Sequence, residues 1–336
     1  PSHINSAFVT GALSAAEARG LSVAYARGYD AANDRASEEM LSEALSAAQE
    51  AEIAVVFAGL TDKYESEGFD RVARAMPPYQ NELIRRISEV QPNTIVVLHC
   101  GSCVEMPWFD SVEAVLCMHL AGDGAGEAAV SLLYGEANPS GKLTETWPLR
   151  LQDNPSYLNF PGEEGRVEYR EGIYIGYRYY DKKEMPVRLP FGFGLSYTSF
   201  AYSDLRLSAE KIADTDTLTV TCKIKNTGTR FGKEAVQLYV CDEQSTAGRP
   251  VRELKGFGKV ALAPGEEKEI SFTLDKRSFA YYETEIHDWF VESGTFRIEI
   301  GASSRDIRLS AKVEVEGTAE IPVVFTPATP LGIVLR

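Results

Sequence analysis

An acidic loop carries the clearest chemistry in the sequence. Residues 59–71 read Gly-Leu-Thr-Asp-Lys-Tyr-Glu-Ser-Glu-Gly-Phe-Asp-Arg, which brings together the carboxylates of Asp62, Glu65, Glu67 and Asp70. Cleavage of a glycosidic bond needs one carboxylic acid that protonates the leaving oxygen and one carboxylate on the opposite side of the sugar. Most acidic loops are only solvated surface, so composition alone leaves both a catalytic and a structural interpretation open.

The elements that must position this loop can be predicted from the first 150 residues, which alternate strand and helix patterns. Uniformly apolar segments at 53–57, 94–98 and 114–118 are typical of buried parallel strands. Helices are expected around residues 40–48, 83–90 and 128–133, with a further helix over 4–18 and a short strand over 21–25. This alternation predicts an open, mostly parallel α/β sandwich over residues 1–150. Ligands bind beyond the carboxyl ends of the strands in such sheets, and the acidic loop follows the first apolar segment directly.

The rest of the chain has a different pattern. Residues 151–200 are rich in Pro, Gly and Tyr and predict a long, ordered connecting segment. Short alternating strands, such as Leu218-Thr-Val-Thr-Cys-Lys-Ile224, dominate residues 201–315. Their spacing predicts an all-β domain, an antiparallel β-sandwich of the fibronectin type III kind. Residues 316–336 are expected to form a C-terminal tail over the surface.

Charge and cysteine content argue against several classes of function. The formal net charge of −15 disfavours nucleic acid, which requires clustered Lys and Arg. No apolar run reaches the roughly 20 residues that cross a bilayer, so no membrane partner is expected. Cys100 and Cys103 form a C-x2-C pair, but no second pair lies at zinc spacing, so neither a metal nor another cofactor is expected. Unpaired thiols and the lack of a visible signal peptide favour a cytoplasmic location.

Several segments resemble glycoside hydrolase family 3, the family of many β-glucosidases, and they follow one another in the same order. Glu65-Ser-Glu-Gly-Phe-Asp-Arg71 resembles the family sequence S/E-x-E-G-Y/F-D-R. The other similar segments are Ser2–Asn5, Pro77–Ile84 (L-P-x-x-Q-x-x-L-I), Gly101–Trp108 (G-S-P-V-E-M-P-W), Gly135–Pro148 (G-x-x-N-P-S-G-K-L-P-x-T-F-P) and Pro190–Thr198 (P-F-G-H-G-L-S-Y-T). Cys103 stands where the family has Pro, and Phe193 where it has His.

The resemblance implies roles for the charged residues of the loop. Glu67 matches the general acid/base of the family, which protonates the departing oxygen and then deprotonates the attacking water. Glu65 is the alternative candidate, and otherwise a carboxylate that orders the loop. Asp70 and Arg71 are expected to support the loop by pairing or hydrogen bonding.

Three aromatic residues are candidates for binding the sugar. Tyr64 and Phe69 flank the carboxylates, and Trp108 ends the G-S-C-V-E-M-P-W segment. They could form a platform for the aglycone sugar, and Tyr64, Phe69 and the bound sugar are expected to bury Glu67. Aromatic residues near a loop more often pack only against protein, so a structural role stays open for each.

The resemblance also implies a partner. The nucleophile of the family is an Asp on a separate (β/α)8 barrel in an S-D-W context, and this sequence contains no S-D-W. We therefore expect a barrel in cis or as a second chain, and no hydrolysis by this chain alone. The implied function is part of a retaining β-glucosidase that releases terminal β-D-glucosyl residues from oligosaccharides or glycosides. The alternatives are the same class of enzyme acting on xylosides, arabinosides or N-acetylglucosaminides, and a non-catalytic carbohydrate-binding or scaffolding module.

Overall fold

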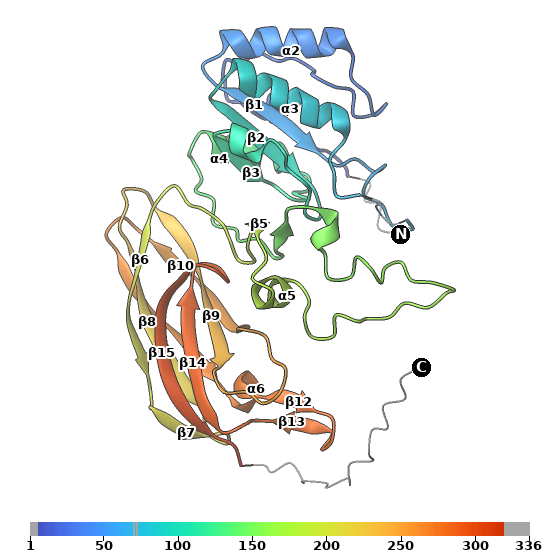
Figure 1. Ribbon diagram of the computed structural model, residues 1–336. Helices are drawn as coiled ribbons and strands as arrows, with labels where there is room; N and C mark the ends of the chain where they lie inside the picture. The colour runs from blue at the N-terminus through green and yellow to red at the C-terminus, as the bar shows by residue number, and fades with distance from the viewer. Residues whose placement is uncertain (1–5, 70, 72, 319–336) are drawn as a thin grey trace.

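The computed structural model describes residues 6–69, 71 and 73–318, which form an α/β unit followed by a β-sandwich (Figure 1). The fold class predicted from the sequence, α/β plus all-β, is confirmed. Within these residues, no helix is both long enough and apolar enough to cross a membrane.

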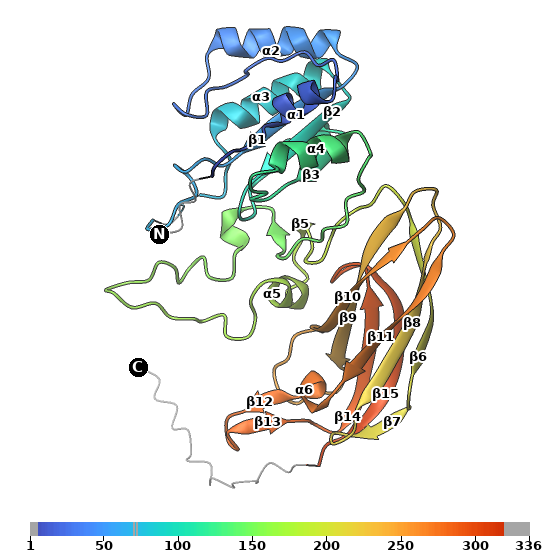
Figure 2. The same ribbon diagram turned by 180° about the vertical axis from the view of Figure 1, so that it is seen from behind.

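A three-stranded parallel sheet forms the centre of the α/β unit. Its strands are β1 (Ala54–Gly59), β2 (Thr94–His99) and β3 (Ala114–Cys117), with β2 in the middle. Helices lie on both sides of it: α2 (Glu38–Glu50) and α3 (Pro78–Val90) on one, α1 (Ala12–Ala18) and α4 (Ala125–Leu133) on the other (Figures 1 and 2). The middle strand is fully covered, since Val96, Val97 and Leu98 are completely buried.

Local chemistry accounts for helices α2 and α3, which cover one side of the sheet. The Ser37 side chain caps α2 by accepting a hydrogen bond from the backbone N–H of Met40 (3.2 Å), and Glu38 and Glu39 occupy its positively polarised first turn. Helix α3 starts with Pro78 in its first turn, where a missing N–H costs nothing. Leu83, Ile84 and Ile87 then form its buried face.

The beginning of the chain differs from the sequence expectation. The helix expected over 4–18 is shorter, because residues 6–11 are not helical and α1 begins at Ala12; residues 4 and 5 lie outside the described part. The strand expected over 21–25 does not form. A strand requires a hydrogen-bonded neighbour, and among the described residues none pairs with this segment, whose Val23 and Tyr25 side chains are exposed.

The segment after the α/β unit is anchored to it. Strand β4 (Trp147–Pro148) pairs with β5 (Val187–Leu189), so the chain leaves the α/β unit and returns to it. Between these strands lie the short 3-10 helix η2 (Leu151–Asp153) and helix α5 (Tyr177–Lys182). The Trp147 side chain is buried in the same core as α3 and β2.

The second unit is a sandwich of two sheets with a buried apolar core. One sheet has the order β10-β9-β14-β15-β7 and the other β11-β8-β6. The bounds are β6 (Phe200–Leu207), β7 (Lys211–Ala213), β8 (Leu218–Asn226), β9 (Gly232–Asp242), β10 (Glu253–Leu262), β11 (Glu267–Leu274), β14 (Gly294–Gly301) and β15 (Ile307–Glu316). A short helix α6 (Lys276–Phe279) and the hairpin of β12 (Tyr281–Glu283) and β13 (Asp288–Phe290) cover one end (Figure 1).

Strand β8 shows why this half of the sequence folds as a sandwich. Leu218, Val220, Cys222 and Ile224 are completely buried, while the Thr and Lys residues between them point outward. This is the period of two that places alternate side chains on opposite faces of a sheet. Burial raises the pKa of Cys222 to about 11, so its thiol stays protonated and acts as a small core residue.

The C-x2-C pair contains two buried thiols with different neighbours. Cys100 forms a hydrogen bond with Cys117 of the adjacent strand, whereas Cys103 contacts the Arg74 guanidinium. All five cysteines are free. No group of three His, Cys, Asp or Glu side chains within the described ranges is arranged to hold a metal ion.

Candidate functional site

The acidic loop leaves the sheet at its carboxyl edge, where the loops after β1 and β2 meet. Gly59, the last residue of β1, pairs with His99, the last residue of β2. A Cβ atom on Gly59 would collide with the His99 carbonyl oxygen, so this close approach requires glycine. The first residues of the acidic loop therefore lie directly against β2.

Gln80 fixes the start of the loop. Its side chain is 1% exposed, and it forms two 2.9 Å hydrogen bonds with Gly59: Oε1 accepts from the backbone N–H, and Nε2 donates to the carbonyl oxygen. Both backbone groups of Gly59 face away from β2, so helix α3 supplies the partner that a further strand would supply in a wider sheet.

We expect Gln80→Leu to destabilise the chain by about 2–4 kcal/mol. The substitution leaves a buried N–H and a buried carbonyl without partners, and each such loss costs about 1–3 kcal/mol. Urea unfolding of the isolated chain measures the difference. The matched control is Gln49→Leu, the same substitution at an exposed position of α2. Equal stability of the two variants would contradict the anchoring role of Gln80.

A second anchor holds Tyr64 of the loop. Asp34 accepts hydrogen bonds from the Tyr64 hydroxyl (3.2 Å to each carboxylate oxygen) and from the Tyr79 hydroxyl (2.8 Å). Burial first, and the hydrogen bond to Asp34 second, raise the pKa of both phenols above the usual value, so they stay protonated and donate. The Tyr64 hydroxyl is thereby directed toward Asp34.

Glu65 is bound by the loop that follows β2. Its carboxylate accepts hydrogen bonds from the backbone N–H of Gly101 (2.8 and 3.0 Å) and from the N–H and hydroxyl of Ser102 (3.2 and 3.3 Å). A carboxylate that accepts several such bonds is fixed in orientation. The Glu65 geometry matches the loop-ordering alternative that the sequence left open.

Arg71 holds the far end of the same loop. Its Nη2 donates to the Cys103 carbonyl oxygen (2.8 Å), and its Nη1 lies 3.7 Å from a Glu65 oxygen. Glu145 accepts a hydrogen bond from the Cys103 N–H (2.8 Å), which fixes that segment in turn. Asp70, the other expected supporting residue, lies outside the described residues.

Glu67 lies between the Glu65 and Arg71 anchors, and its side chain is exposed. Gly68 follows it with φ 97°, a left-handed conformation that favours glycine and turns the loop. Since Glu67 is exposed, the expected burial against Tyr64 and Phe69 is not formed in the described part of the chain, where Tyr64 is bound to Asp34 and Phe69 is itself 51% exposed.

The structure corrects the expectation for Trp108. Its side chain is 3% exposed, packs in the core of the α/β unit, and donates its Nε1–H to Asn81 Oδ1 (2.8 Å). A ring without an open face has no surface for stacking a sugar. Trp108 instead joins the segment after β2 to helix α3.

Two of the anchoring residues were not singled out from the sequence. Gln80 stands in the P-x-x-Q segment, whose apolar residues alone predicted a helix. Asp34 lies in a stretch without any pattern, and its partner Tyr64 is 30 residues away. Only the tertiary fold brings Asp34 and Tyr64 together, so no local sequence pattern marks Asp34 as an anchoring residue.

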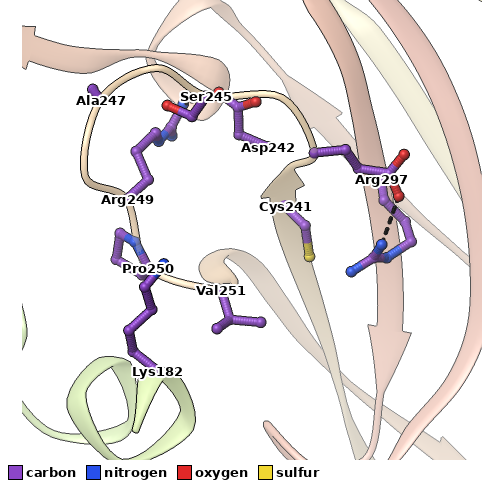
Figure 3. A pocket seen from close by; sticks show the side chains of 10 residues that line it. Lys182, Cys241, Asp242, Ser245, Ala247, Arg249, Pro250, Val251 and Arg297 are labelled. Carbon is purple, nitrogen blue, oxygen red and sulfur yellow. Dashed lines mark hydrogen bonds and ion pairs between the residues drawn. The ribbon is translucent and has the colours of Figure 1, made fainter.

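A pocket of about 530 Å³ lies in the β-sandwich, beside α5 and the loop after β9 (Figure 3). Its buried cation Arg249 already binds Asp242 (3.1 Å), and Arg297 binds Glu243 (2.6 Å). Lys182 of α5 lies at its edge (Figure 3). Because its two arginines are already neutralised by acidic neighbours, these charges do not favour an anionic ligand.

Known proteins match both units of the chain. Residues 4–177 match the glycosyl hydrolase family 3 C-terminal domain, and residues 234–304 match the fibronectin type III-like domain. Over 306 residues the chain is 55% identical to thermostable β-glucosidase B of Acetivibrio thermocellus. The aligned residues cover 91% of this chain and 40% of that protein. It is 39% identical over 317 residues to an exo-α-(1→6)-L-arabinopyranosidase of Bifidobacterium breve, covering 94% of this chain and 42% of that protein.

A solved structure matches the fold as well. The crystal structure of the Bifidobacterium adolescentis GH3 β-glucosidase has a TM-score of 0.91 and 41% sequence identity, covering 95% of this chain and 47% of that one. The chain thus spans less than half the length of these three proteins.

Proposed function

Because this chain belongs to glycoside hydrolase family 3, we propose that it is part of a retaining β-glucosidase and supplies the general acid/base, Glu67. The nucleophile in this proposal is an Asp of a (β/α)8 barrel that completes the site, in cis or as a second chain. The substrate is a terminal β-D-glucosyl residue of an oligosaccharide or glycoside.

Each chemical step uses Glu67 in one protonation state. In the first step the barrel Asp attacks the anomeric carbon while protonated Glu67 gives its proton to the departing oxygen. In the second step the Glu67 carboxylate takes a proton from water as that water attacks the glycosyl-enzyme. The second step restores the protonated acid and the free nucleophile.

The observation that supports this role is the way the loop holds Glu67. Anchors on both sides of it, Glu65 with Gly101 and Arg71 with Cys103, hold the loop at the carboxyl edge of the sheet, and Glu67 between them is an exposed residue. Acid/base catalysis depends on such positioning, because a displacement of about 1 Å can cost 10²-fold in rate.

The aromatic residues beside Glu67 are proposed to differ in role. Phe69 is 51% exposed two residues after Glu67, so its ring is available to an aglycone sugar. Tyr64 is only partly exposed and its hydroxyl binds Asp34, so we assign it chiefly to shaping the loop.

Native mass spectrometry of the purified chain, with a nitrophenyl β-glucoside assay on the same sample, tests whether the chain requires a barrel for activity. We expect the chain alone to be inactive, because retaining cleavage needs two carboxyl groups about 5–5.5 Å apart and one of them is on the barrel. We expect activity in a chimaera in which the chain replaces the matching span of A. thermocellus β-glucosidase B. Turnover by the isolated 37.0 kDa species would contradict the proposal.

An α-L-arabinopyranoside is the second candidate substrate, because the B. breve relative is named for that activity. The two substrates share the chemistry assigned to Glu67 and differ in the sugar ring that the barrel has to recognise. Assays of the chain with its own barrel, using nitrophenyl β-D-glucoside and nitrophenyl α-L-arabinopyranoside, decide between them by the ratio of kcat/KM values.

A further inference from the structure

The segment between η2 and α5, residues 154–176, takes no part in the site described above. We call these 23 residues the arm. The arm runs out from the body of the molecule and returns to it, and the structure describes every one of its residues (Figures 1 and 2). A connection this long without helix or strand is uncommon in compact domains unless it is functional.

The arm carries many apolar side chains but buries none of its residues. Positions 163–170 are all exposed. Seven large apolar side chains of the arm are exposed, among them Leu158 (90%), Tyr169 (80%) and Ile175 (56%). Single exposed apolar residues are ordinary, but a group of them on one projecting segment marks an interaction surface.

The arm is shaped without a partner. Its tip is a two-residue turn in which Glu164 and Gly165 have positive φ angles, closed by hydrogen bonds between the backbones of Glu163 and Arg166 (2.9 and 3.0 Å). Left-handed residues at both central positions are typical of tight hairpin turns. A segment that is already shaped loses less conformational entropy when it binds.

Both ends of the arm are fixed to the body. Just before it, the Leu151 N–H donates to Glu105 of the α/β unit (2.9 Å). Near its other end, the Tyr174 hydroxyl donates to the Arg249 carbonyl oxygen of the β-sandwich (3.4 Å). The arm therefore projects from a defined base between the two units.

The composition of the arm favours a protein partner. Its charged residues are four Glu and two Arg, mixed with aromatic side chains. Aromatic residues and Arg are enriched in protein interfaces. Neither nucleic acid nor an anionic membrane attracts a segment in which acidic residues outnumber basic ones.

We propose that the arm docks onto the barrel of the same enzyme, an inference that rests on the proposed function and names the surface through which the barrel is held. More than half of each relative compared above lies outside the span that this chain matches, so an occupant of sufficient size exists in such enzymes. The arm also projects to the same side of the molecule as the carboxyl ends of β1 and β2, from which the acidic loop extends (Figures 1 and 2). A barrel bound there faces the Glu67 loop and the arm together.

Tryptic cleavage of the arm tests this docking without any measurement of activity. Arg166 and Arg170 are exposed in the chain, and we expect trypsin to cut after both. In the chimaera with the A. thermocellus barrel we expect these cuts to slow by roughly tenfold or more, because the docked arm must open before it is cleaved. The double variant Leu158→Asp with Tyr169→Asp should restore fast cleavage in the chimaera.

The matched control is Phe231→Asp with Phe257→Asp, two exposed Phe residues of the β-sandwich. This pair should leave the arm protected, and neither pair should change the melting temperature of the isolated chain.

Equal cleavage rates in chain and chimaera would overturn the proposal. So would protection that already exists in the isolated chain and grows with its concentration, since a second copy would then be the occupant. If the chimaera protects the arm from trypsin but hydrolyses no glucoside, docking is supported and the proposed catalysis is contradicted. If the chimaera hydrolyses the glucoside but leaves the arm unprotected, the proposed catalysis is supported and docking is contradicted.

Discussion

Glu67→Gln in the active chimaera is expected to lower kcat/KM for cellobiose by roughly 10²- to 10⁴-fold, the usual contribution of a general acid. Gln keeps the size of the side chain but neither gives nor takes a proton. The loss should be much smaller for a dinitrophenyl glucoside, whose leaving group departs without protonation. The measurement is kcat/KM for the two substrates side by side.

The control for this prediction is Asp62→Asn, an exposed acidic residue of the same loop. It removes one negative charge nearby and should leave both rates within about twofold of the parent. A Glu67→Gln enzyme that keeps its activity on cellobiose would instead favour the alternative of a non-catalytic carbohydrate-binding or scaffolding module.

Glu65→Gln is expected to give the second largest loss, about 10- to 100-fold in kcat, because it misplaces Glu67. The Gly101 and Ser102 N–H groups need an acceptor, and a Gln side chain presents them with an NH2 group on one side. Arg71 also loses the carboxylate that lies 3.7 Å from its Nη1. Steady-state kinetics and hydrogen exchange of residues 60–69 measure the two effects.

Hydrogen exchange separates a positioning role of Glu65 from a role as the acid itself. A residue that acts by placing Glu67 lowers the cellobiose rate more than the dinitrophenyl glucoside rate, as the loss of Glu67 does, and its loss also increases hydrogen exchange in the loop. A Glu65→Gln variant that loses as much cellobiose activity as Glu67→Gln while hydrogen exchange in the loop is unchanged would transfer the acid/base role from Glu67 to Glu65.

The sequence was most informative where periodicity alone determines structure. The alternation from Leu218 to Ile224 predicts β8, and all four of its apolar residues are completely buried. The apolar run from Thr94 to Leu98 predicts β2 to within one residue of its end. In both segments the burial of apolar side chains dominates, and that term can be read from the order of the residues.

Prediction failed where the outcome depends on contacts between distant segments. Residues 21–25 have a local strand pattern but no pairing neighbour among the described residues. Trp108 ends the G-S-C-V-E-M-P-W segment, and only the packing shows that its ring is buried in the core and donates to Asn81. The bonds from Gln80 to Gly59 and from Tyr64 to Asp34 likewise arise only after the helices have packed on the sheet.

Azide rescue of Glu67→Ala in the chimaera tests the central claim most directly. With the carboxylate removed, azide can enter its space and attack the glycosyl-enzyme without a general base. If Glu67 is the acid/base, azide should raise the turnover of a dinitrophenyl glucoside, and NMR should identify the product as β-glucosyl azide, the net retained configuration. If azide neither accelerates Glu67→Ala nor appears in a glucosyl product, Glu67 does not face the anomeric carbon and the proposed function is contradicted.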